Sequence, residues 1–129
     1  MPGRLHHVVL DCPDPSALAT FYSRLLGVPV TYRSDDWVVV AASEATSGLA
    51  FQLATDHEPP RWGDPHHPQQ VHVDVMVDDL AGTVLEVVAM GARALREERD
   101  GSQVFADPAG HPFCLVPRPR WAPPIGFAK

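Results

Sequence analysis

Residues 71–77, with the sequence VHVDVMV, decide the fold of this chain. Four valines alternate with His72, Asp74 and Met76, and this period of two is typical of a strand packed on one face. The acidic pair Asp78-Asp79 follows and predicts a helix cap. The helix itself is indicated by an apolar stripe and a glycine stop at Leu80, Val84, Val87, Val88 and Gly91.

The same order occurs earlier in the chain. Residues 5–12, LHHVVLDC, form an apolar strand candidate, and Asp14-Pro15 is a cap followed by proline at the first helical position. One helical face and a glycine stop come next, at Leu18, Phe21, Tyr22, Leu25, Leu26 and Gly27. His7 therefore corresponds to His72, and Asp14 to Asp79. The chain contains an internal repeat.

Each predicted helix is followed by three strand candidates. These are residues 28–33, 37–42 and 49–54 in the first copy, and 93–98, 103–106 and 112–116 in the second. Asp100-Gly101 predicts a hairpin turn. We therefore expect an α+β fold in which two tandem βαβββ modules form a curved mixed sheet around a cleft. The single domain would span residues 1–129, with module one at 5–54, a linker at 55–70, module two at 71–116 and a tail at 117–129.

Composition excludes several classes of protein. The chain has 129 residues and a net charge of −6, which disfavours nucleic acid and anionic membranes as partners. Its two cysteines are too few for a disulfide scaffold, and no apolar run reaches the roughly 20 residues of a membrane helix. We expect a cytoplasmic protein that binds a small molecule. Exposed sheet edges favour a homodimer.

Strand alternation predicts which side chains face the cleft. On the inner face we expect His7, Gln52, His72 and Cys114, with Asp11, Asp74 and Met76 nearby. Trp62, in the linker, is a candidate wall or lid of the ligand pocket. Trp62, Asp11 and Met76 are the candidate substrate contacts. Trp37 and Phe105 are interpreted as packing residues.

Three segments together resemble the vicinal oxygen chelate superfamily, which includes glyoxalase I, bleomycin-resistance proteins and extradiol dioxygenases. They are His7-Val-Val-Leu-Asp-Cys-Pro-Asp14, His72-Val-Asp-Val-Met-Val-Asp-Asp79, and Asp107-Pro-Ala-Gly110 followed by Phe113-Cys-Leu-Val116. The resemblance covers residues 5–116 and is closest to a glyoxalase-like subgroup. It implies a protein that acts on or binds a small oxygen-rich or planar molecule between its modules.

The resemblance also implies four positions that hold a divalent metal: His7, Gln52, His72 and Cys114. The family usually has glutamate at the fourth position, where this chain has Cys114. Two imidazoles and a thiolate suit zinc, whereas a set containing carboxylates suits harder ions. The candidate ions are Zn, Ni, Mn and Fe.

Each residue has an alternative role. His7 and His72 are either metal ligands or hydrogen-bonding residues, and Gln52 either binds the metal or contacts the substrate. Cys114 is a ligand, a nucleophile or a small packing residue. Asp74 is a candidate general base, or else part of an ion pair or a hydrogen bond to a neighbouring strand.

Two functions follow from these alternatives. One is a metal-dependent lyase, isomerase or oxygenase, in which the ion stabilises an anionic intermediate. The other is a metal-free protein that sequesters a drug or metabolite, as the bleomycin-resistance branch does. A third reading, an interaction module, is compatible with the fold alone.

Overall fold

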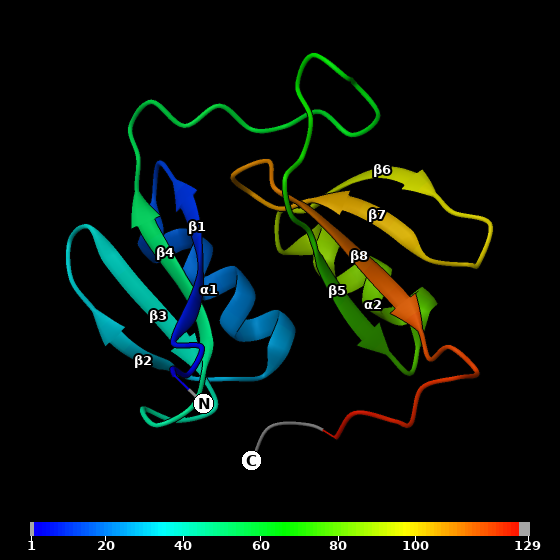
Figure 1. Cartoon of the computed structure of the whole chain (residues 1–129). Helices are drawn as coiled ribbons and strands as arrows, with labels where there is room; N and C mark the ends of the chain where they lie inside the picture. Colours follow the sequence, from blue (N-terminus) through cyan, green and yellow to red (C-terminus); the bar gives the residue numbers. More distant parts are fainter. Residues whose placement is uncertain (1, 127–129) are drawn as a thin grey trace. The chain divides into compact units, whose positions relative to one another are not determined.

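A computed structural model of the chain describes residues 2–126 and divides them into two compact units. The first unit runs to His57, and the second is Glu58–Gly126. Each unit contains one helix and one sheet (Figure 1). Within the described residues, no helix is long and apolar enough to cross a membrane.

The two units repeat one order of elements. The first contains β1 (His7–Cys12), α1 (Pro15–Leu26), β2 (Val30–Arg33), β3 (Trp37–Ala41) and β4 (Gly48–Leu53). The second contains β5 (Val73–Val77), α2 (Leu80–Ala89), β6 (Arg93–Glu97), β7 (Gln103–Ala106) and β8 (Pro112–Pro117). The strands and helices predicted from the sequence are all present, with ends that differ by a few residues.

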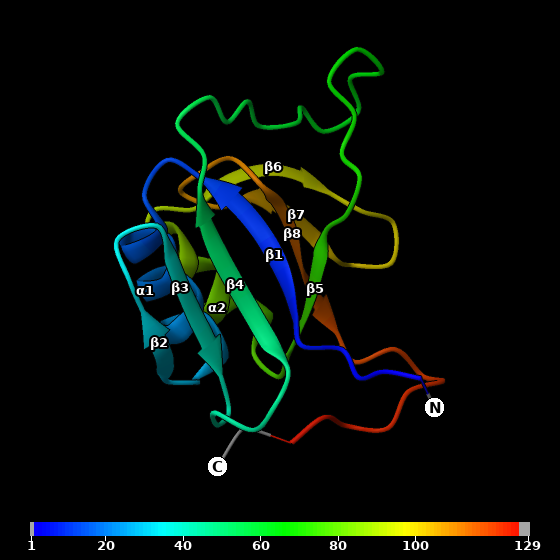
Figure 2. The ribbon, with the colours of Figure 1, turned by 60° about the vertical axis from the view of Figure 1, so that its left-hand side comes forward.

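Each unit has its own open, mixed sheet of four strands. The strand order is β1-β4-β3-β2 in the first sheet, seen side by side in Figure 2, and β5-β8-β7-β6 in the second. The pairs β1/β4 and β5/β8 are parallel, and the other neighbours are antiparallel. The α+β class and the two tandem βαβββ modules are confirmed. The boundaries of the predicted domain stay a prediction.

The helix caps form as the sequence predicts. The Asp14 carboxylate accepts a hydrogen bond from the Ala17 amide at 3.1 Å, and Asp79 accepts one from the Gly82 amide at 3.0 Å. These bonds satisfy amides that have no partner inside the helix. Gly27 ends α1 at a φ of 66°, in the left-handed region that glycine adopts readily.

Aromatic pairs form part of the core of each unit. In the first, α1 packs on β3 and β4, and the Tyr22 ring stacks on Phe51 at 5.5 Å. In the second, Phe105 stacks on Phe113 at 5.5 Å, so its expected packing role is confirmed. Leu53, the last residue of β4, is 39% exposed.

Both sheets contain a β-bulge at the corresponding place. Pairing shifts between Val30 and Tyr32 in β2, and between Ala94 and Arg96 in β6. The extra residues are Thr31 and Leu95. A bulge turns the following side chains toward the other face of the sheet. Neither bulge is predicted from the sequence, because one extra residue in such a short strand does not clearly change the alternation of apolar and polar residues.

Truncation of Phe51 tests the packing of the first unit. Phe51→Ala removes a fully buried ring that stacks on Tyr22 and should lower the free energy of unfolding by about 3–5 kcal/mol. Urea denaturation followed by circular dichroism measures this loss. Leu85→Ala, at a residue 74% exposed, is the matched control and should change stability by less than about 0.5 kcal/mol. Equal effects of the two variants would contradict the assigned core.

Candidate functional site

The parallel register of β5 and β8 brings two reactive side chains together. Asp74 is the Cα partner of Cys114, and partners in adjacent strands point to the same face of a sheet. His72 lies just before β5, two residues from Asp74, so alternation gives it the same face. Met76, the partner of Val116, continues this row along the strand and is half-buried. This register places Asp74, Met76, Cys114 and Val116 on one face of the sheet. That this face lines a cleft between the modules stays a prediction.

His72, Asp74 and Cys114 form a compact donor cluster. One nitrogen, one carboxylate oxygen and the sulfur all lie within 4.8 Å of one another. The His72 Nε2 atom is 3.2 Å from Asp74 Oδ1. Asp74 thus contacts the His72 ring and also makes a hydrogen bond with Cys114 on the neighbouring strand β8. The second contact agrees with the alternative role given for Asp74.

The cluster is open to solvent on one side. The side chains of His72 and Asp74 are 34% and 58% exposed, whereas Cys114 is buried at the base. Burial, and after it the negative charge of Asp74, raises the pKa of the Cys114 thiol to about 12. Cys114 is thus a neutral thiol at physiological pH unless a cation joins it. This disfavours Cys114 as an unaided nucleophile, since thiolate is the reactive form.

Two neighbours orient the His72 ring. Its Nδ1 atom lies 3.0 Å from Gln69 Oε1, so Nδ1 donates to the amide and Nε2 faces Asp74. In this tautomer Nε2 has a free lone pair, which is the form of histidine that binds a metal ion. The edge of Trp62 meets the His72 ring at a centroid distance of 5.5 Å and an angle of 81°. Sequence reasoning missed Gln69, although a polar residue three positions before a candidate ligand could have indicated it.

The donor types fit a divalent metal. Imidazole nitrogen, thiolate and carboxylate are the donors of zinc sites, and three protein ligands with one open position are typical of catalytic zinc. A second hydrogen bond to the ligating histidine, as Gln69 supplies, is the usual companion of such sites. His72, Asp74 and Cys114 therefore could hold a zinc ion.

The first unit arranges its candidate residues differently. His7 is the partner of Gly48, and Gln52 is the partner of Asp11. Because His7 and Gln52 are four residues apart in register, about 13 Å separates them along the strands. Asp11 and Gln52 share a face, and Trp37 joins that row as the β3 partner of Gln52. Ligation of a metal by His7 and Gln52 stays a prediction.

Gly48, the β4 partner of His7, lies very close to β3. A Cβ atom there would lie 2.0 Å from the Val40 carbonyl oxygen and 2.7 Å from Ala41 Cβ, so only glycine fits. The His7 ring stacks on His6 at 3.7 Å, and its buried Nδ1 atom has no hydrogen-bond partner within residues 2–126. Burial, and then the charge of His6, lowers the pKa of His7. The lowered pKa favours the neutral form of the His7 ring.

His7 also lines a cavity of about 300 Å³ in the first unit. The other lining residues are mainly aromatic or apolar: His6, Thr31, Tyr32, Trp37, Val39 and Glu44. Trp37 is half-buried here, so it contributes to a cavity wall in addition to the packing expected from the sequence.

A rigid turn precedes β8 in the second unit. The buried Asp107 carboxylate accepts hydrogen bonds from the amides of Ala109 and His111 at 2.8 and 3.0 Å. It also lies 2.8 Å from the His111 ring nitrogen Nδ1. These bonds fix the start of β8 and thereby the position of Cys114 two residues further along the strand.

Solved structures with the same fold come from several bacteria. A glyoxalase-related enzyme from Fulvimarina pelagi is 21% identical with a TM-score of 0.71, and the match covers 97% of this chain and 94% of that one. A glyoxalase/bleomycin resistance protein/dioxygenase family enzyme from Burkholderia phytofirmans PsJN is 16% identical with a TM-score of 0.68, covering 89% and 98%. The fosfomycin resistance protein FosX from Mesorhizobium loti is 14% identical with a TM-score of 0.64, covering 94% and 96%.

Sequence comparison identifies the family. No curated protein sequence matches the chain. The family model described as a glyoxalase-like domain matches residues 7–116, which contain both βαβββ modules and the donor cluster. The chain therefore belongs to the glyoxalase-like domain family, within the glyoxalase/bleomycin resistance/dioxygenase or vicinal oxygen chelate superfamily.

Proposed function

We propose that this protein binds a small oxygen-rich molecule at a zinc ion held by His72, Asp74 and Cys114. The observation that carries the proposal is the convergence of their three donor atoms within 4.8 Å. The partial exposure of His72 and Asp74 supports an open coordination position for a water molecule or a substrate oxygen.

The metal would act as a Lewis acid that polarises the oxygen atoms of the bound molecule. This chemistry suits an isomerisation or an elimination in which negative charge develops on oxygen. Gln69 would keep the His72 ring in the tautomer that presents Nε2 to the ion. The further role of Asp74 as a proton shuttle, and completion of the site by His7 and Gln52, stay predictions.

Cobalt provides a spectroscopic test of this site. Titration of metal-free protein with Co²⁺ should give one bound ion and a thiolate-to-cobalt charge-transfer band. Because the Cys114 thiol must lose its proton on binding, the affinity should increase as the pH rises. Cys114→Ala removes a direct ligand, so it should abolish the band and weaken binding by at least the roughly 10–100-fold that loss of an outer-shell partner costs.

Cys12→Ala is the matched control. Cys12 is also buried, but it belongs to β1, and its removal should leave the band unchanged. A band that persists in Cys114→Ala, or the absence of cobalt binding to the wild-type protein, would refute the metal site. Thermal unfolding of each variant shows whether it is folded.

A second candidate is metal-free binding of a planar drug or metabolite in the first unit. It is supported by the cavity of about 300 Å³ with Tyr32, Trp37 and His7 in its lining. Aromatic walls favour flat ligands through stacking, and pockets of this size suit small molecules.

Thermal-shift screening of metal-free protein with planar aromatic compounds tests the second candidate. Trp37→Ala should weaken a hit by about 10-fold, the equivalent of one aromatic contact. Trp121→Ala, at a residue 86% exposed in the tail, should bind like the wild type. Equal binding by Trp37→Ala and the wild type would contradict an aromatic site at this cavity.

A further inference from the structure

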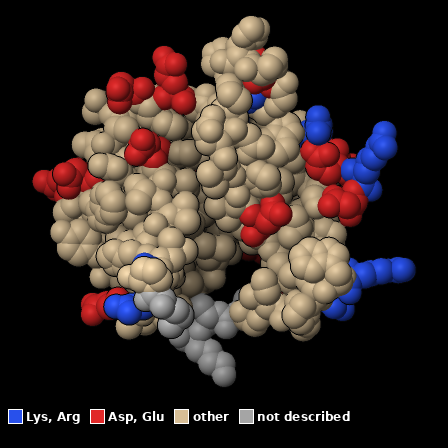
Figure 3. Space-filling model, in the orientation of Figure 1, with Lys and Arg blue, Asp and Glu red and all other residues tan. Residues whose placement is uncertain are grey.

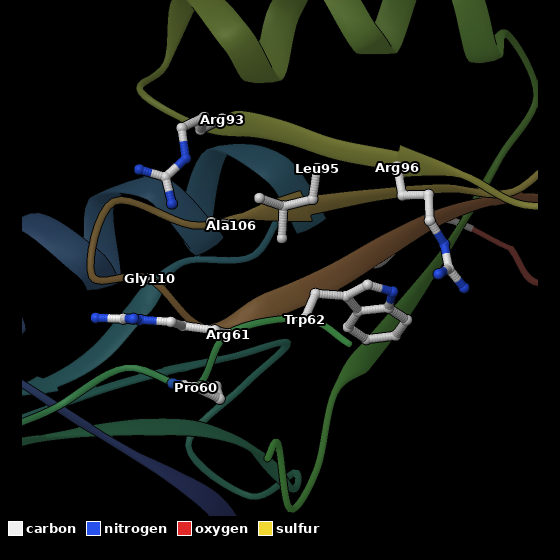
Figure 4. A pocket seen from close by; sticks show the side chains of 8 residues that line it. All are labelled: Pro60, Arg61, Trp62, Arg93, Leu95, Arg96, Ala106 and Gly110. Atoms are coloured by element: carbon white, nitrogen blue, oxygen red, sulfur yellow. The ribbon is translucent and has the colours of Figure 1, made fainter. Parts of the chain in front are cut away.

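Three arginines surround one cavity of the second unit. The cavity has a volume of about 280 Å³, and Arg61, Arg93 and Arg96 line it together with Trp62 and Leu95 (Figure 4). Among the described residues that line it, none is acidic. The chain as a whole carries a net charge of −6, so this group of positive side chains is opposite in sign to the net charge.

The bulge in β6 brings two of these arginines to the same face. In a regular strand, residues three apart point to opposite faces. Here Arg93 pairs with Ala106 and Arg96 with Val104, because Leu95 is the extra residue. Ala106 and Val104 are two residues apart in β7, so Arg93 and Arg96 face the same side. Figure 4 shows Leu95 between them, directed toward the cavity.

The third arginine comes from the segment that precedes β5. Pro59 packs tightly on Gly110, where an added Cβ would lie 2.5 Å from the Pro59 Cβ. The Arg61 amide donates to the His67 carbonyl at 2.7 Å. This segment is thereby attached to the turn that Asp107 fixes. Figure 4 shows Arg61 and Arg93 reaching the same end of the cavity from opposite walls.

The charges of Arg61 and Arg93 are available to a ligand. Arg96 pairs with Glu98 at 2.9 Å, whereas the ion pairs within residues 2–126 include neither Arg61 nor Arg93. Asp64 is the acidic neighbour of Arg61. In Figure 3, the blue side chains lie mainly on the second unit, around the turn after β6 and the chain beyond β8. Arg61 thus has a carboxylate nearby but no ion pair with it, and Arg93 is in none of these ion pairs. An arginine that is not held in an ion pair, beside a cavity, suits a carboxylate or phosphate group.

The cavity shares a sheet face with the donor cluster. Register aligns Asp74, Cys114, Val104 and Arg96 in one row across β5, β8, β7 and β6. Three strand spacings give about 14 Å between the ends of this row. Trp62 contacts His72 and lines the cavity, so it lies between the two sites. Arg93 lies about 7 Å along the strands from this row, since its partner Ala106 is two residues from Val104. A ligand that joins the two sites must therefore extend both across the sheet and along it.

We propose that the cavity binds the anionic end of the protein's small-molecule ligand, a carboxylate or phosphate group held by Arg61 and Arg93. The inference rests on the proposed function for the other end of that molecule, which reaches the metal. Trp62 would pack against the connecting part of the ligand. The substrate class is thus a small organic oxyanion.

Calorimetric titration tests the cavity with four probes: phenyl phosphate, benzoate, inorganic phosphate and uncharged benzyl alcohol. Metal-free and zinc-loaded protein are both used. We expect phenyl phosphate or benzoate to bind both forms, to bind better than benzyl alcohol, and to weaken as salt concentration rises. Comparison of the affinities of phenyl phosphate and benzoate shows whether the cavity prefers a phosphate or a carboxylate group.

Arg93→Gln and Arg61→Gln should each weaken the anionic probes by about 10-fold or more. Arg99→Gln, in the turn between β6 and β7 and outside the cavity lining, is the matched control and should bind like the wild type. All three are at exposed residues, and their unfolding temperatures verify the fold. Equal weakening by Arg99→Gln would show general charge attraction and overturn the proposal.

The cobalt spectrum separates failure of this inference from failure of the proposed function. A normal thiolate-to-cobalt band with no binding of any anionic probe overturns the arginine site alone. The opposite result is also informative. If the protein lacks the band but still binds a probe in a way that depends on the arginines, the arginine site is supported and the metal site is refuted.

Discussion

The parallel pairing of β5 with β8 is the constraint on which the candidate site depends. It sets Asp74 beside Cys114, and alternation along the chain adds His72 to the same face. A shift of one residue in this register would send Cys114 to the opposite face and disperse the cluster. The buried Asp107 turn before β8 and the apolar residues Phe113 and Leu115, both fully buried, hold the register in place.

The two copies of the internal repeat have the same backbone arrangement but different side chains. Both sheets have the same strand order and a bulge at the corresponding position. In the first unit the cavity near this bulge is lined by Tyr32 and Trp37, whereas in the second it is lined by Arg93 and Arg96. One scaffold thus presents an aromatic surface in one copy and a cationic surface in the other.

The sequence allowed much of the fold to be predicted, because its signals are local. Alternation in residues 71–77, aspartate caps at Asp14 and Asp79, and the glycine after each helix all depend on near neighbours. The shared face of Asp74 and Cys114 also followed from alternation. The offset between His7 and Gln52 could not be predicted in this way, since the pairing of β1 with β4 is set by packing between distant residues. The arginine cavity was missed because Arg93 and Arg96 share a face only through the bulge.

Direct measurement of the metal's ligands tests the central claim, that His72, Asp74 and Cys114 bind zinc. X-ray absorption at the zinc edge of the loaded protein reports ligand types and distances. The account predicts one sulfur at about 2.3 Å together with nitrogen and oxygen ligands at about 2.0–2.2 Å. A shell of nitrogen and oxygen alone, without sulfur, would contradict it.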